Sequence, residues 1–182
     1  VNTLSAGDTV AVIRAGKFAD RWSELAKAYG LTAIDLTAPF GETVPAARVA
    51  ETLRAHGNVK AVLTQHSETS TGVLHDVRAY AAVTRGTDAL LIVDAVSSLG
   101  IADLPMDAWG IDVVVAGSQK GLMLPPGLGF CALGERAWAR ARTSTLPKYY
   151  FNLTEEAKSV RKNEAHFTPA VSLVVGLRTV LK

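Results

Sequence analysis

A lysine and an aspartate stand close behind two apolar runs that are typical of buried strands. Asp94 directly follows the run 90–93, and Lys120 comes four residues after the run 113–116. Because the carboxyl ends of parallel strands meet at one edge of a sheet, where ligands bind, we expect both side chains at that edge. Taken alone, Asp94 is equally consistent with a cap for a turn or a helix, and Lys120 with an ordinary surface lysine. Together they can bracket a flat, partly charged ligand.

Pyridoxal phosphate is a cofactor that needs such a pair. An amine forms a Schiff base with its aldehyde, and a carboxylate beside its ring nitrogen keeps that nitrogen protonated, because a negative charge favours the cationic form. Once substrate displaces the lysine, its free amine can move a proton between the substrate Cα and the cofactor. The segment Pro125-Pro126-Gly127 is rigid enough to hold a lysine that must not drift. We therefore expect Lys120 and Asp94 to serve a pyridoxal phosphate site.

Short apolar runs alternate with amphipathic segments along the chain. The expected strands are 9–13, 32–36, 59–64, 90–94, 113–116 and 130–133, and the expected helices are 20–29, 45–56, 74–85 and 135–142. This alternation predicts an α/β fold: a mostly parallel sheet, built with right-handed crossovers, with helices on both faces. Residues 143–168 have little periodicity, so we expect loops and short helical turns there.

The composition limits the class of protein. The 182 residues are 48% hydrophobic with a net charge of +2, which suits a buried sheet in one sizeable domain. The apolar runs are too short to span a bilayer, and the basic cluster 158–162 lacks interleaved aromatic residues. We therefore expect neither a membrane nor a nucleic acid as a partner.

Cysteine and histidine usage gives two further expectations. The single cysteine, Cys131, indicates a reducing compartment, here taken to be cytoplasmic, and its apolar surroundings predict a small buried side chain. The four histidines are dispersed along the chain without ligand spacing, so no metal site is expected.

Three segments resemble the active-site segments of the class V, fold-type I aminotransferases. These are HSETSTGVLHDV at 66–77, VDAVSSLG at 93–100 and GIDVVVAGSQKGLMLPPGLGF at 110–130. The resemblance is closest to the alanine–glyoxylate and serine–glyoxylate (serine–pyruvate) group, and it runs the length of the chain. It implies the pyridoxal phosphate-dependent transferase fold of type I, with residues 1–182 as part of the large, cofactor-binding domain.

The resemblance assigns roles to three polar residues of the strand ends. It makes Lys120 the Schiff-base lysine and Asp94 the partner of the pyridine nitrogen, as the chemistry of the residues also indicates. It places Gln119 in hydrogen-bonding distance of the cofactor phosphate region. These assignments are those of matching motif positions in this sequence.

Four more cofactor-binding positions follow from the same resemblance. Thr69 falls where the family has a hydroxyl near the phenolic oxygen, Val96 packs on one ring face, and Phe18 stacks on the other. Thr168 is the candidate for reaching the cofactor phosphate of a neighbouring subunit. Simpler explanations stay open: Phe18 and Val96 as core residues, Thr69 as a turn residue, and Thr168 as a helix N-cap before Pro169.

The resemblance also implies an activity and an assembly. We expect an aminotransferase that moves an amino group from alanine or serine to glyoxylate or a similar 2-oxo acid, in a homodimer with active sites at the interface. The family's phosphate-cradling N-terminal segment would precede Val1. Its C-terminal small domain, which holds the arginine for the substrate carboxylate, would follow Lys182.

Three alternatives remain at this point. A pyridoxal phosphate-dependent lyase or cysteine desulfurase shares the fold, but a desulfurase usually needs a thiol on a mobile loop, and Cys131 lies in an expected strand. The chain by itself could be an inactive fragment. A nucleotide-binding α/β module would need a Gly-rich phosphate loop after a strand, and the segment 117–121 has the wrong spacing.

Overall fold

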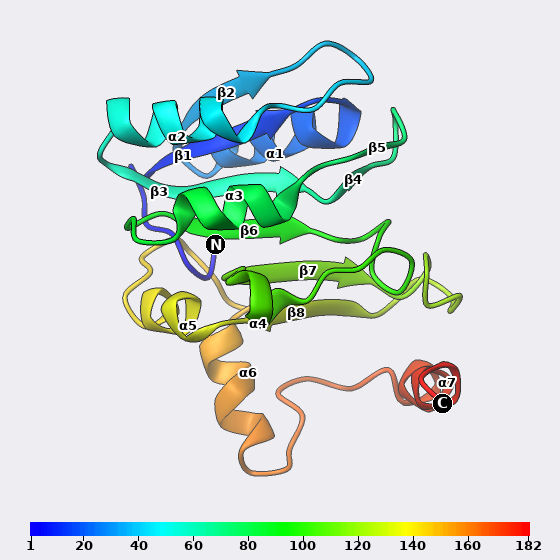
Figure 1. The fold of residues 1–182 in the computed structure, drawn as a ribbon. Coiled ribbons are helices and arrows are strands. Elements are labelled where there is room, and N and C mark those ends of the chain that lie inside the picture. The colour runs from blue at the N-terminus through cyan, green and yellow to red at the C-terminus, as the bar shows by residue number, and fades with distance from the viewer.

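The computed structural model describes residues 1–182 and is built around a six-stranded sheet (Figure 1). The strand order is β2-β1-β3-β6-β7-β8, in which β8 alone runs antiparallel to its neighbour. The strands of this sheet are β1 (Thr9–Arg14), β2 (Thr32–Thr37), β3 (Val59–Gln65), β6 (Leu90–Asp94), β7 (Val113–Gly117) and β8 (Gly129–Leu133). A second, two-stranded sheet pairs β4 (Ser67–Glu68) with β5 (Val73–Leu74).

Helices cover both faces of the large sheet. They are α1 (Lys17–Ala28), α2 (Ala46–Ala55), α3 (Val77–Thr84), α4 (Met106–Trp109) and α5 (Glu135–Ala141). Two more helices follow in the chain, α6 (Leu153–Val160) and α7 (Val171–Val180). Successive strand residues point to opposite faces, so Val62 joins the core under α2, α3 and α4, whereas Leu63 joins the core on the side of α1 and α5. The predicted α/β fold with a mostly parallel sheet is confirmed.

Two helices begin three residues away from their predicted starts. The helix expected at 74–85 begins at Val77, since the Asp76 side chain accepts a hydrogen bond from the backbone N–H of Ala79. Helix α1 begins at Lys17, three residues before the expected start, although its own N-cap position is Gly16 and supplies no side-chain bond. As a result, Phe18 lies in the first turn of a helix.

The last two helices make little contact with the sheet. Helix α6 is longer than the short turns expected between 143 and 168, and α7 lies to one side of the sheet (Figure 1). Neither helix contains a buried residue. No helix in the structure combines the length and the apolar character that crossing a membrane requires.

The expectation that Cys131 is buried is wrong. Cys131 is exposed on β8, which forms an edge of the sheet. An edge strand is paired on one side only, and Gly129 and Ala132 of β8 are exposed as well. An apolar run alone therefore did not distinguish an edge strand from a central one.

Candidate active site

A pocket opens at the carboxyl edge of the sheet, where β3, β6 and β7 end. Strand pairing sets Gln65 beside Asp94 and Asp94 beside Val115, so β3 and β6 end side by side and β7 continues two residues further, to Gly117. The pocket is lined by Phe18, Gln65, Ser67, Thr69, Asp94, Val96, Ser97 and Lys120. Five of the seven residues assigned from the sequence therefore meet in one place, contributed by α1 and by the segments after β3, β6 and β7.

Asp94 presents a carboxylate whose two oxygens are both oriented. Its Oδ1 accepts a hydrogen bond from the backbone N–H of Val96 at 2.9 Å, and its Oδ2 accepts one from the indole N–H of Trp22 at 3.2 Å. Burial raises the pKa of Asp94, and the two donors oppose that rise by favouring the charged form. The bond to Val96 is the local turn cap that the sequence left open, and Asp94 lines the pocket as well.

Lys120 is exposed at the pocket, and the loop that carries it is fixed by the residue two places before it. Ser118 is fully buried; its hydroxyl donates to the carbonyl of Pro125 at 2.7 Å and accepts from the backbone N–H of Leu128 at 3.2 Å. Gly121, the next residue after Lys120, packs closely against the loop after β6. A Cβ added at Gly121 would lie 2.3 Å from the carbonyl oxygen of Leu99. Both contacts hold the backbone of Lys120 in place.

Thr69 and Ser97 bring two hydroxyl groups together on one wall. Their side-chain oxygens are 2.5 Å apart, although the residues belong to different loops. Thr69 thus bonds a neighbouring loop and not its own backbone, so the explanation of Thr69 as a self-bonded turn residue is wrong. Thr71 has that role, since its hydroxyl donates to the carbonyl of Glu68.

Glu68 joins two walls of the pocket from behind. It is completely buried, and its carboxylate accepts hydrogen bonds from the backbone N–H groups of Phe18, Ala19 and Ser70 and from the Ser70 hydroxyl. These contacts cap the N-terminus of α1, which has no capping side chain of its own. Gly16 is required there, because an added Cβ would lie 2.4 Å from the Glu68 side chain.

Gln65 is the unsatisfied polar group of the pocket. Its side chain is 1% exposed, yet neither the amide nitrogen nor the amide oxygen has a hydrogen-bond partner. Buried amides are rarely left in this state because the loss of hydration is not compensated. Since Gln65 also lines the pocket, the pocket is suited to a ligand with polar atoms.

Two of the assigned residues lie outside this pocket. Gln119 is exposed, and its side chain folds back toward the backbone of Gly117. Thr168 is exposed between α6 and α7, and it is not an N-cap, because α7 begins at Val171 with Ala170 as the capping residue. Their assigned contacts with the cofactor phosphate stay predictions.

Motif reasoning missed Ser67 and Ser97, which line the pocket, and three further residues that shape it. Only partial signals for those three exist in the sequence. Trp22 is four residues after Phe18 on the same helix, so it shares a face with it. Gln65 ends a strand next to the one that ends with Asp94. The missing cap at Gly16 signalled a capping group from elsewhere, but nothing identified Glu68 as that group.

Comparison with known proteins identifies the family. The family model named aminotransferase class-V matches residues 1–182. The chain belongs to the class-V aminotransferases. This membership argues against the nucleotide-binding alternative, for which the sequence has no phosphate loop of the right spacing.

Several known proteins are similar over the whole chain. A protein named soluble hydrogenase 42 kDa subunit from Anabaena cylindrica is 47% identical over 100% of this chain and 48% of its own length. An L-aspartate–glyoxylate aminotransferase from Paracoccus denitrificans is 43% identical over 97% of this chain and 46% of its length. The solved alanine–glyoxylate aminotransferase from Nostoc sp. superposes with a TM-score of 0.93 at 29% identity, over 99% of this chain and 48% of that one.

The pocket fits pyridoxal phosphate, the cofactor that class-V aminotransferases imply. It offers an amine, a carboxylate, two adjoining hydroxyls and an aromatic ring, from Lys120, Asp94, Thr69, Ser97 and Phe18. A flat pyridine ring that carries a nitrogen, a phenolic oxygen and an aldehyde has a complementary group for each. The unpartnered amide of Gln65 in the same pocket adds an independent sign of a polar ligand.

Proposed function

We propose that the protein is a pyridoxal phosphate-dependent aminotransferase that moves an amino group from alanine or serine to glyoxylate or a similar 2-oxo acid. One observation carries the proposal: Lys120 and Asp94 line the same pocket as Phe18, Thr69 and Val96. An amine and a half-buried carboxylate on one pocket are the two groups that this cofactor chemistry needs.

Each pocket residue has a distinct task in this proposal. Asp94 would lie beside the ring nitrogen, Phe18 and Val96 would enclose the ring, and Thr69 would lie near the phenolic oxygen. When bound, the cofactor supplies an electron-poor ring that stabilises negative charge at the substrate Cα. The amine of Lys120 would hold the cofactor and, once free, would move a proton between the substrate Cα and the cofactor carbon that carried the aldehyde.

The electrostatics of the pocket favour a cationic ring nitrogen. The carboxylate of Asp94 is contacted by two neutral donors, the Val96 backbone and the Trp22 indole, so its negative charge is oriented without being cancelled. An uncompensated carboxylate stabilises an adjacent cation strongly where water is scarce. Asp94 would therefore keep the ring nitrogen protonated at neutral pH.

The activity belongs to the complete protein, because the chain spans about half the length of the relatives it matches. We propose that residues 1–182 are part of the large, cofactor-binding domain, and that the phosphate-cradling segment and the substrate arginine lie in the other half. The named substrates of the relatives, aspartate or serine with glyoxylate, support a small amino donor and a 2-oxo acid acceptor. The alternative that the isolated chain is inactive agrees with this division.

A homodimer in the cytoplasm is part of the same proposal. The segment 143–168 is the candidate contact with a second subunit, and it exposes three consecutive aromatic residues, Tyr149, Tyr150 and Phe151. Exposed apolar side chains that cluster in this way favour an interface. Sedimentation of the complete protein tests the assembly, and a monomer at micromolar concentration would contradict it.

Borohydride reduction tests the cofactor and its lysine together. The complete protein is mixed with pyridoxal phosphate, its visible absorbance is recorded, and it is reduced and mapped by mass spectrometry of peptides. We expect a visible band and a reduced adduct on Lys120, and neither in Lys120→Ala. Lys148 serves as the control, since Lys148→Ala removes an amine outside the pocket and should leave the adduct on Lys120. Labelling of other lysines with none on Lys120 would refute the proposal.

Product analysis separates transamination from desulfuration. In this chain the only thiol, Cys131, lies on β8 and lines a different, apolar pocket, away from Lys120. We therefore expect glycine to form from glyoxylate with alanine or serine as donor, and no sulfide to be released from cysteine. The same assays on the isolated 182 residues distinguish an incomplete site from an active one.

A further inference from the structure

The Asp94 carboxylate receives a side-chain hydrogen bond from a residue far away in the sequence. Trp22 lies on α1, 72 positions before Asp94, and its indole nitrogen is 3.2 Å from Oδ2. The other oxygen, Oδ1, is bonded at 2.9 Å by the backbone N–H of Val96, within the loop of Asp94 itself. The loop therefore fixes one oxygen, and α1 fixes the other.

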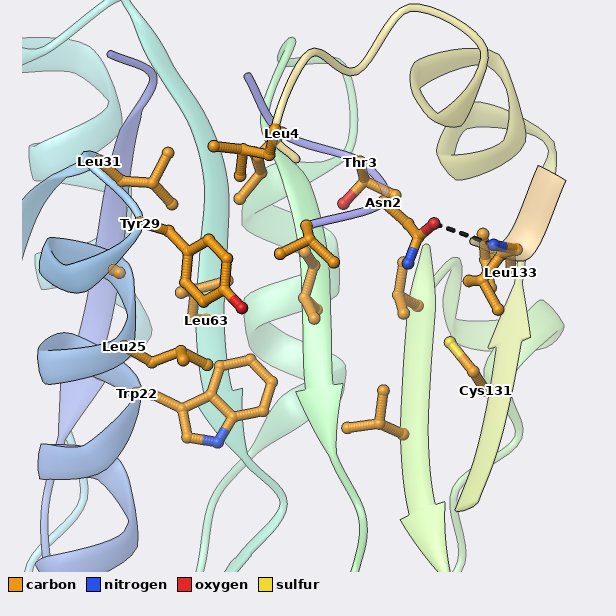
Figure 2. Close-up of a pocket in the computed structure, with 17 residues that line it drawn as sticks. Asn2, Thr3, Leu4, Trp22, Leu25, Tyr29, Leu31, Leu63, Cys131 and Leu133 are labelled. Carbon is orange, nitrogen blue, oxygen red and sulfur yellow. Dashed lines mark hydrogen bonds between the residues drawn. The ribbon is translucent and has the colours of Figure 1, made fainter. Parts of the chain in front are cut away.

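The indole ring of Trp22 is held by an apolar pocket on the α1 side of the sheet. Figure 2 shows the ring lying over the strands with its nitrogen toward their carboxyl ends, below Leu25 and Tyr29. Of the 17 residues that line this pocket, 15 are hydrophobic. None of the residues that line this pocket carries a carboxylate that could accept a hydrogen bond from the indole. The one polar atom of the ring donates to Asp94 instead.

The charges around Asp94 make a neutral donor significant. Burial raises the pKa of Asp94, and the nearby negative charge of Glu68 adds to that rise. Lys120 is the cation that shares the pocket. No cationic side chain makes a hydrogen bond or an ion pair with Asp94. An indole N–H orients a carboxylate and supports its charged form, whereas an arginine in the same place would cancel the charge.

We propose that Trp22 is a positioning residue. It fixes the Asp94 carboxylate in the orientation needed to accept a hydrogen bond from the protonated ring nitrogen of the cofactor. This inference rests on the proposed function, in which Asp94 is the partner of that nitrogen. It assigns to α1 two tasks in the pocket: Phe18 from its first turn lines the pocket, and Trp22 from its second turn orients the carboxylate.

The test removes the donor and keeps an aromatic ring. Trp22→Phe is compared with Trp138→Phe, which alters a half-buried tryptophan on α5 whose indole makes no hydrogen bond in this structure. In the complete protein without cofactor, the pKa of Asp94 is measured by carbon-13 NMR of the carboxyl groups and assigned with Asp94→Asn. We expect the pKa of Asp94 to rise in Trp22→Phe and to stay unchanged in Trp138→Phe, because only the first variant loses a donor to the charged form.

Cofactor affinity gives a second measurement. Because Trp22→Phe loses a hydrogen bond to a charged group, its dissociation constant for pyridoxal phosphate should rise roughly tenfold. The dissociation constant of Trp138→Phe should not change. If Trp22→Phe does not fold, benzothienylalanine at position 22 replaces it, since that side chain keeps the indole shape and lacks the N–H.

The outcomes distinguish this inference from the proposed function. An unchanged pKa of Asp94 and an unchanged dissociation constant, together with an adduct on Lys120, would overturn the role of Trp22 and leave the function standing. A raised pKa of Asp94 with no adduct on Lys120 would show that Trp22 supports the carboxylate but that the proposed function is wrong.

Discussion

The amino and carboxyl ends of the parallel strands, here called the amino edge and the carboxyl edge of the sheet, each contain an aspartate that is shielded from water. The two aspartates have different partners. At the amino edge, Asp112 precedes β7; its Oδ2 accepts the backbone N–H of Leu91 at 2.8 Å, and its Oδ1 lies 3.6 Å from Nε of Arg136. At the carboxyl edge, Asp94 ends β6 and is contacted by the neutral donors of Val96 and Trp22. Burial raises the pKa of both carboxyl groups.

The difference lies in which group supplies the positive charge. Arg136 compensates Asp112 within the fold, and it also bonds the carbonyls of Thr87 and Ala89, so this edge is electrostatically complete. Asp94 has no such cation bonded to it. A charge that is shielded from water and oriented but not compensated destabilises the protein by itself and is suited to a cationic ligand. Asp112 thus has the contacts of a structural carboxylate, whereas Asp94 has those that the proposed function requires.

The largest expected effect comes from removing the charge at each edge in turn. Asp94→Asn should lower kcat/KM for aminotransfer about 10²–10³-fold in the complete protein, because the ring nitrogen loses its counter-charge. Asp112→Asn keeps an oxygen for Leu91 and should leave kcat/KM within a few-fold. Steady-state assays with glyoxylate measure both variants. Equal losses in the two variants would remove the distinction between the edges.

Glu68 sharpens the comparison because it lies at the carboxyl edge but acts as a structural group. Glu68→Ala leaves the N–H groups of Phe18, Ala19 and Ser70 without their acceptor, so the free energy of unfolding should fall by about 3 kcal/mol. Urea unfolding measures this loss. Glu51→Ala, at an exposed position of α2, is the control and should change the free energy of unfolding by less than about 0.5 kcal/mol.

The effect of Glu68 on the pocket follows from the same contacts. If the cap of α1 positions Phe18, then Glu68→Ala should also weaken pyridoxal phosphate binding, and Phe18→Leu should add little in that background. Fully additive losses of binding free energy would show that Glu68 stabilises the fold without acting through Phe18.

Sequence patterns predicted the sheet and the positions of Asp94 and Lys120 because these depend on local signals. Apolar runs of four or five residues mark the central strands, and the residues just after each parallel strand must lie at the carboxyl edge. Asp94 and Lys120 were therefore placed correctly by strand ends alone. The family resemblance then added Phe18, Thr69 and Val96, which the structure brings to the same pocket.

The remaining features depend on contacts between distant parts of the chain. Trp22 reaches Asp94 across 72 positions, and Glu68 caps a helix that begins far earlier in the chain, so no local pattern contains either contact. The exposure of Cys131 follows from the position of β8 at the end of the strand order, which an apolar run does not encode. Long-range packing decided these points.

A smaller effect is expected from truncating the structural aspartate. Asp112→Ala removes the acceptor of the buried Leu91 N–H and leaves Arg136 without its carboxylate, which should lower the free energy of unfolding by about 1–2 kcal/mol. Urea unfolding of this variant is compared with that of Asp103→Ala, at an exposed loop position. A loss no larger than that of Asp103→Ala would mean that the amino edge does not depend on its carboxylate.

The pH dependence of stability gives the smallest and most specific comparison. The pKa values of Asp94 and Asp112 are raised in the folded protein, so above the ordinary value of about 3.9 the unfolded chain releases protons that the native state still holds. The unfolded state then binds fewer protons, and the free energy of unfolding falls as pH rises through that window. Each group contributes a slope of at most about 1.4 kcal/mol per pH unit.

Substitution assigns these slopes to the two edges. Urea unfolding between about pH 4 and pH 7 should show a shallower decline for Asp94→Asn than for the unaltered protein, and likewise for Asp112→Asn. Because the two residues lie at opposite edges of the sheet and share no bonded partner, the double variant should lose both contributions additively. If the free energy of unfolding of Asp94→Asn falls with pH as steeply as that of the unaltered protein, the native state does not disfavour the charge of Asp94. In that case Asp94 would resemble Asp112, and the uncompensated carboxylate could not be what attracts a cationic ring.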